Sequence, residues 1–116
     1  MIVHLLFNGI PIGAGSLMQL DPPMGIATGT FEPTDHYDRD SHANIVEGKY
    51  LSDRGKSLVA ISNEYGPIDC SGVGIEDSFE SIGEQVVTIF GIPYPKYSEI
   101  FADYEDYKSY YPDRSE

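Results

Sequence analysis

The chain has 116 residues, 41% of them hydrophobic, and a formal net charge of −12 at neutral pH. This length and apolar content suit a single domain, residues 1–116, with its own core, and exclude general disorder. The negative charge argues against direct nucleic-acid binding, which depends on lysine and arginine, and against binding to an anionic membrane surface. We therefore expect a basic protein as the partner and leave the oligomeric state open.

Cysteine content and hydropathy bear on the cellular compartment. Cys70 is the single cysteine, so no internal disulfide can form, which favours a reducing compartment. Residues 1–7 lack the basic start and the small-residue cleavage site of a secretory signal. No apolar run reaches the roughly 20 residues that a membrane span needs. We expect a cytoplasmic protein.

The N-terminus predicts a β-hairpin. Residues 2–7 form a β-favouring apolar run that ends at Asn8-Gly9. This dipeptide is the strongest short hairpin signal because a type I′ turn needs two positive φ angles. The returning strand begins at Ile10. Since Pro11 has no amide hydrogen to donate, this strand is expected to lie at a sheet edge or to carry a bulge.

Short apolar runs alternate with turn residues from there to residue 92, with a first interruption at Asp21-Pro22-Pro23. The polar segment 32–41 predicts an exposed loop, and the acidic segment 76–84 predicts one helical turn. The apolar runs predict strands over residues 16–20 (alternatively a helical turn), 24–31, 43–51, 57–62, 65–73 and 85–92.

The pattern changes to helical spacing after Pro95. Ser98 is the expected N-cap, Glu99 suits the first turn, and Pro112 ends the helix. Residues at spacings of three and four predict a stripe packed on the core: Tyr97, Ile100, Phe101, Tyr104, Tyr107 and Tyr111. The predicted fold is therefore α+β, with a mostly antiparallel sheet or partly open barrel of six or seven short strands and a C-terminal helix.

Six of the nine tyrosines lie between Tyr94 and Tyr111, interleaved with carboxylates. Tyrosine is enriched where proteins bind one another, and carboxylates beside it favour a basic partner. Because the helical stripe is expected to face the core, the remaining residues are the candidate contacts. The predicted partner-binding residues are Tyr94, Glu99, Asp103, Asp106 and Tyr110, with Glu76, Asp77 and Glu80 as a second patch.

Patterns for catalysis or cofactor binding are weak. Segment 35–42 holds two histidines and three aspartates. Its spacing fits neither a zinc site nor an EF-hand, so we expect a solvated loop, with metal binding as the alternative. Asp69 disfavours a thiolate at Cys70, which predicts a structural cysteine. Residues 13–16 lack the lysine of a phosphate-binding loop, and we expect neither an enzyme nor a cofactor.

Residues 8–37 form the motif NGxxIG…DPPMGxxxGxFxPTxxY, which resembles small uncharacterised bacterial proteins and implies no activity. The small, acidic, single-domain character also resembles immunity proteins of bacterial polymorphic-toxin and contact-dependent growth-inhibition systems. This is a resemblance of class, and no residue role is carried over. It implies an inhibitor that binds and occludes a basic toxin domain, for which nuclease activity is expected.

Three classes of function follow from these features. The first is the immunity-type inhibitor, acting through an acidic surface that contains tyrosine. The alternative is a structural or accessory subunit of a larger bacterial assembly, in which the tyrosine stripe is packed internally and no inhibition occurs. The third is a hydrolase or metal-dependent enzyme that uses the His36–His42 loop, and a stoichiometric metal would distinguish it.

Overall fold

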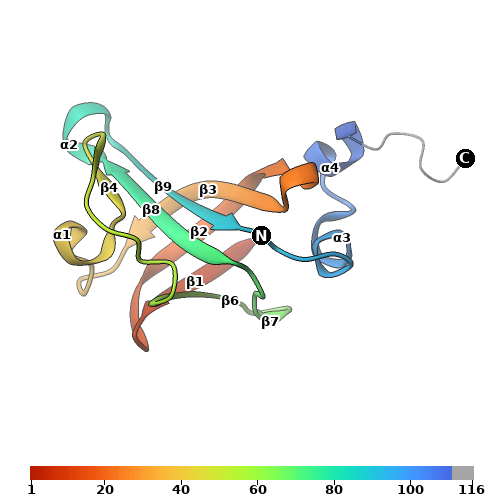
Figure 1. The fold of residues 1–116 in the computed structure, drawn as a ribbon, viewed down its shortest axis with the longest axis horizontal. Coiled ribbons are helices and arrows are strands. Elements are labelled where there is room, and N and C mark those ends of the chain that lie inside the picture. The colour runs from red at the N-terminus through yellow and green to blue at the C-terminus, as the bar shows by residue number, and fades with distance from the viewer. Residues whose placement is uncertain (111–116) are drawn as a thin grey trace, which may run out of the picture.

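The computed structural model describes residues 1–110, which form one curled, open sheet with short helices at its two ends (Figure 1). The strands are β1 (Ile2–Phe7), β2 (Ile10–Asp21), β3 (Ile26–Pro33), β4 (Ile45–Val46), β5 (Lys49–Tyr50), β6 (Leu58–Ser62), β7 (Gly66–Pro67), β8 (Gly72–Ser78) and β9 (Glu84–Phe90). The helices are the 3₁₀ turn η1 (Pro22–Met24), α1 (Arg39–His42), α2 (Phe79–Ile82), α3 (Lys96–Phe101) and α4 (Glu105–Tyr110). The α+β class is confirmed, with nine strands in the described region rather than six or seven.

The strand order is β5-β4-β8-β9-β3-β2-β1-β6-β7. Neighbouring strands pair antiparallel, except that β4 runs parallel to β8. At the open side of the curl, β6 contacts β8, but no ladder within residues 1–110 joins these two strands. The mostly antiparallel sheet that the sequence predicts is therefore confirmed, and it stays open.

The β1–β2 hairpin forms as predicted. Asn8 and Gly9 have φ angles of 49° and 87°, as a type I′ turn requires. The ladder shifts register between Leu5 and Leu6, opposite Pro11, so the predicted bulge accommodates the proline. The edge position is wrong because β2 pairs with β1 on one side and with β3 on the other. The returning strand also continues without a helical turn over 12 residues.

The β2 and β3 strands approach each other closely at Gly29. A Cβ atom at this position would overlap the backbone carbonyl oxygen of Ser16, so a larger residue does not fit without a backbone shift. The same ladder shifts register between Leu17 and Gln19, which leaves Met18 in a bulge. The bulge and the glycine together bend the sheet at this point.

Predictions for the middle of the chain need correction. The strand expected over residues 43–51 is two short strands, because Glu47 and Gly48 take positive φ angles of 49° and 79° and turn the chain between β4 and β5. The strand expected over residues 65–73 is the short β7, which does pair with β6, followed by the start of β8. The helical turn expected over residues 76–84 forms as α2 (Phe79–Ile82), and β8 and β9 extend into both ends of that segment.

The single C-terminal helix of the prediction is two helices, α3 and α4, separated at residues 102–104. Ser98 is not the N-cap, because α3 begins directly after Pro95, whose fixed φ angle suits a helix start. The Ser98 hydroxyl instead donates to the Pro95 carbonyl oxygen at 2.9 Å. The aromatic stripe faces the core as predicted, through buried Tyr97, Ile100 and Phe101 and half-buried Tyr104 and Tyr107. Tyr111 and Pro112 lie outside the described residues.

The core fills the inside of the curled sheet and continues to the buried face of α3. Its members are Val3, Leu5, Ile12, Leu17, Leu20, Ala27, Phe31, Ala43, Leu58, Ala60, Ile68, Val73, Ile75, Val87, Ile89, Ile92, Tyr97, Ile100 and Phe101. In the part of the chain that the structure describes, no helix is long and apolar enough to cross a membrane.

Candidate protein-binding surfaces

A groove lies between the start of β1, the β6–β7 turn and the α3–α4 connection, with a volume of about 450 Å³. We call it the acidic groove and define it by its lining residues: Met1, Ile2, Ser62, Asn63, Glu64, Tyr65, Ile100, Asp103 and Tyr104. These residues come from three segments that are far apart in the sequence. The groove therefore forms only when the chain folds.

Two exposed carboxylates, Glu64 and Asp103, line this groove beside two tyrosines. A side-chain hydrogen bond to Glu64 raises the pKa of Tyr65, with further contributions from burial and from nearby charges that include Asp103. Burial raises the pKa of Tyr104, and the charge of Glu64 adds to that rise. Met1 also lines the groove, and its N-terminal amine, whose pKa burial lowers, donates to the Leu17 carbonyl oxygen at 3.2 Å. Since negative charge reaches both tyrosines and no lysine or arginine side chain lines the groove, the two carboxylates favour an incoming cation.

Both walls of the acidic groove are held by local structure. Ser62 is 2% exposed, and its Oγ accepts the backbone N–H groups of Glu64 and Tyr65, each at 3.1 Å. On the other wall, the Tyr104 ring packs edge-on against buried Phe101, with ring centroids 5.3 Å apart. The groove is thus shaped before any partner binds, which lowers the entropy lost on binding.

Four residues of the first predicted patch are exposed: Tyr94, Glu99, Asp103 and Tyr110. Of these, Asp103 lines the acidic groove. Tyr94 is 48% exposed, and its hydroxyl donates to the carbonyl oxygen of Pro22 at 2.9 Å. The structure therefore brings Asp103 together with residues outside the predicted patch.

Asp106, the fifth member of that patch, has a role inside the protein. It is half-buried, and its Oδ2 accepts the backbone N–H of Leu20 at 3.0 Å. A charged acceptor makes such a bond stronger than a neutral one. This contact links α4 to β2, two elements that lie far apart in the sequence.

Asp77, from the second predicted patch, is only 2% exposed. Its Oδ2 accepts the hydroxyl of Tyr37 at 2.7 Å and the side-chain N–H of Gln85 at 3.1 Å, and its Oδ1 accepts the Phe79 backbone N–H at 3.0 Å. Burial raises the pKa of the Asp77 carboxyl, but these hydrogen bonds outweigh burial and hold the pKa below its usual value. The assignment of Asp77 to an exposed patch is thus corrected, because its carboxylate is used internally.

Glu76 and Glu80 of the same patch are exposed. Glu80 pairs with Arg39 at 2.9 Å, and the Glu80 backbone N–H donates to the Glu47 carboxylate at 2.9 Å. Both glutamates belong to the end of the molecule that carries α1 and α2, whereas α3 and α4 lie at the other end (Figure 1). The two predicted patches therefore do not form one surface.

Of the residues considered for metal binding or catalysis, His36 is exposed, whereas His42 and Cys70 are partly buried. The loop predicted over residues 32–41 is shorter, because β3 and α1 occupy its ends. His42 Nδ1 accepts the Asp38 backbone N–H at 3.0 Å, its ring packs against Phe7, and burial lowers its pKa. Burial also raises the pKa of the half-buried Cys70. Within residues 1–110, no group of three or more His, Cys, Asp or Glu side chains is arranged to hold a metal ion.

The chain matches no family model, no curated protein and no solved structure. The candidate site is therefore inferred from the geometry of this chain's own side chains. Sequence reasoning missed Glu64 and Tyr65, which follow β6 in a turn. The residues around Asn63 do predict a turn, but no local pattern places that turn opposite Asp103.

Proposed function

We propose that the protein is an immunity-type inhibitor that binds a basic bacterial toxin domain, a nuclease, and occludes its phosphate-binding cleft. The observation that carries this proposal is the acidic groove, where Glu64 and Asp103 converge beside Tyr65 and Tyr104. The net charge of −12 supports the same choice of partner, since an acidic protein attracts a basic one and speeds its arrival.

A lysine or arginine of the partner is the group that best fits the acidic groove. Its positive charge would offset the repulsion between Glu64 and Asp103 and pair with both carboxylates. The rings of Tyr65 and Tyr104 offer rigid contact area and an aromatic face to a cation. The turn fixed by Ser62 holds one wall of this arrangement in place.

A nuclease is a suitable target because it needs lysine and arginine to hold the nucleic-acid backbone. An acidic protein that covers this cleft blocks substrate both sterically and by competing for the same cations. Inhibition by this mechanism weakens as salt rises, since screening acts on partly exposed charges. The proposal therefore predicts a salt-dependent dissociation constant.

One observation favours the alternative of a structural or accessory subunit in a larger bacterial assembly. Tyr97 is buried, and Tyr104 and Tyr107 pack partly against the core, so the tyrosine stripe serves the fold. A stripe used in this way requires no inhibitory partner. Under this alternative, charge changes in the acidic groove leave any toxin activity unaffected.

The test uses the toxin domain encoded beside the gene for this protein, with nuclease activity and binding measured together. We expect the double variant Glu64→Gln/Asp103→Asn to raise the dissociation constant about 100-fold and to relieve inhibition. The matched control is Asp35→Asn/Asp40→Asn, which removes the same charge from exposed residues near α1. Equal losses in both variants, absence of inhibition, or salt-independent binding would contradict the proposal.

A further inference from the structure

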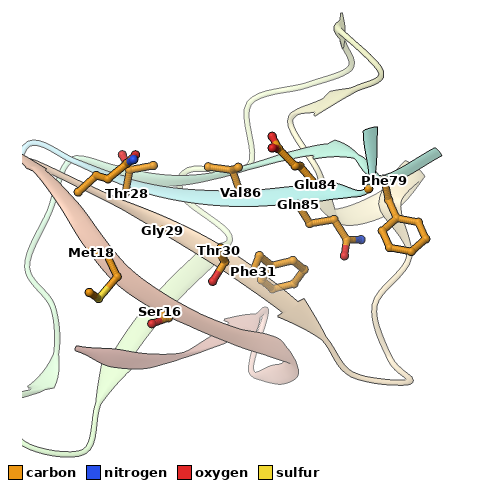
Figure 2. A pocket seen from close by; sticks show the side chains of 12 residues that line it. Ser16, Met18, Thr28, Gly29, Thr30, Phe31, Phe79, Glu84, Gln85 and Val86 are labelled. Atoms are coloured by element: carbon orange, nitrogen blue, oxygen red, sulfur yellow. The ribbon is translucent and has the colours of Figure 1, made fainter. Parts of the chain in front are cut away.

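A second hollow, of about 420 Å³, lies on the face of β2, β3 and β9 that the core does not cover (Figure 2). We call it the sheet groove. Ser16, Thr28 and Thr30 are among the small polar residues that line it, and Figure 2 shows Met18 and Phe79 on opposite sides of Thr30. The groove thus has a mixed floor of small polar residues together with Gly29 and Val86, between two large apolar side chains.

Those apolar side chains are unusually open to solvent. Met18 is 64% exposed and Phe79 is 60% exposed. Met18 stands at the β2 bulge, and Phe79 begins α2 between β8 and β9. Exposed large apolar side chains on two sides of a hollow are typical of a surface that another protein covers.

The wall that carries Phe79 is fixed by the buried carboxylate of Asp77. That carboxylate accepts the Phe79 backbone N–H at 3.0 Å and the side-chain N–H of Gln85 at 3.1 Å, and both donors line the groove. The Arg39–Glu80 ion pair holds the same helix. Phe79 is therefore presented from a supported position, and a partner would not need to order it first.

The charged side chains around the sheet groove are acidic. Glu84 lines it, and no lysine, arginine or histidine is among its lining residues. A smaller adjoining hollow shares Ser16 and Thr30 with it and adds Glu32 and Ile2. Since Ile2 also lines the acidic groove, one partner surface can extend across both grooves.

The strands beneath the sheet groove have no free edges. β2 pairs with β1 and β3, and β9 pairs with β3 and β8. An extended peptide therefore cannot add to the sheet here through backbone hydrogen bonds. Recognition must use side chains that project from one face, which is what an amphipathic helix presents to a groove.

We propose that the sheet groove binds the apolar face of an amphipathic helix whose flanks carry lysine or arginine, and that this helix belongs to the same basic partner. The inference rests on the proposed function for the identity of that partner. Large apolar residues of the helix contact Met18 and Phe79, and its cations lie near Glu84 and Glu32.

The experiment is an NMR titration of the isotope-labelled protein with a synthetic helix-forming peptide of leucine and lysine, about 14 residues long. Its leucines follow helical spacing, and a comparison peptide has the same composition with the leucines scrambled. We expect the amide shifts to map to the sheet groove around Met18, Thr30 and Phe79, and the scrambled peptide to bind at least about tenfold more weakly. Shifts confined to the acidic groove, or equal binding of both peptides, would overturn the inference.

Matched variants separate the groove from general surface hydrophobicity. Met18→Ser and Phe79→Ser are each expected to weaken binding of the patterned peptide about tenfold. The controls are Met24→Ser, at a position also 64% exposed, and Ile82→Ser, at a 65% exposed position on the same helix as Phe79. Neither control residue lines the groove, and equal losses in controls and test variants would refute the inference.

The two proposals can fail separately. Patterned-peptide binding at the sheet groove without toxin inhibition would overturn the proposed function and the identity of the partner, and would leave the sheet groove standing as a helix-binding surface. Toxin inhibition with no patterned-peptide binding at the groove would overturn the inference alone. The wild-type shift map needs no variant, so a folding defect in Phe79→Ser cannot obscure the result.

Discussion

The two ends of the molecule, one with α1 and α2 and the other with α3 and α4 (Figure 1), both carry carboxylates and use them differently. At the α1–α2 end, Asp77 accepts three hydrogen bonds and Glu80 pairs with Arg39. At the α3–α4 end, Glu64 and Asp103 stand exposed in a groove that no lysine or arginine lines, and the hydrogen bond that Glu64 accepts comes from the exposed Tyr65 side chain beside it. Acidic composition alone therefore does not identify a binding surface, and what matters is whether the fold already supplies partners for the charges.

The largest effect is expected from Asp77→Ala, at the internally satisfied end. The change leaves the Tyr37 hydroxyl, the Gln85 amide and the Phe79 backbone N–H without their acceptor. We predict a loss of about 3 kcal/mol in the free energy of unfolding, measured by urea denaturation. Glu76→Ala, at the exposed neighbour, is the control and should change stability by less than about 0.5 kcal/mol. Similar losses in the free energy of unfolding for both variants would contradict the proposed difference between the two ends.

The stability of the protein at acidic pH should reveal the same difference between the two ends. Because hydrogen bonds hold the pKa of Asp77 below its usual value, its contribution to stability is present above the unfolded-state pKa. It is lost as pH falls through the lower folded-state pKa. We predict that stability falls less steeply below about pH 4 in Asp77→Asn than in the wild type. An unchanged slope in Asp77→Asn would contradict the assignment.

A smaller effect is expected from Asp106, which holds α4 against β2. Asp106→Ala removes the acceptor of the Leu20 backbone N–H, with a predicted cost of about 1 kcal/mol in unfolding free energy. Asp103→Ala, in the connection just before α4, is the control with no expected loss. A stability loss in Asp103→Ala as large as that in Asp106→Ala would show that the Asp103 carboxylate also stabilises the fold and is not held free for a partner.

The parts of the fold that depend on local signals were predictable. Asn8-Gly9 fixed the hairpin turn, and the three-and-four spacing of Tyr97, Phe101 and Tyr104 identified the buried helical face. The two-residue length of β4 was not predictable, because β4 is defined partly by parallel pairing with β8, a strand distant in the sequence. The pairing of β7 with β6 was expected, but nothing in the local sequence limits it to two residues. The break between α3 and α4 likewise has no marker such as glycine or proline at residues 102–104.

The candidate site was predictable only in part. Asp103 was identified from its position outside the helical stripe, but its groove partner Glu64 arrives through tertiary packing. Asp77 was misplaced because the acidic segment was interpreted as a helical turn. Alternation along β8 puts Val73, Ile75 and Asp77 on one buried face, and a strand interpretation of that segment would have predicted an inward carboxylate.

The most direct test of the central claim is the dissociation constant for the proposed basic toxin partner, measured with charge removed from one end at a time. Glu64→Gln/Asp103→Asn and Glu76→Gln/Glu80→Gln remove the same charge from the α3–α4 end and the α1–α2 end. We predict an increase of about 100-fold for the first pair and less than about threefold for the second. Equal increases, or a larger increase for the second pair, would contradict the assignment of the acidic groove as the partner site.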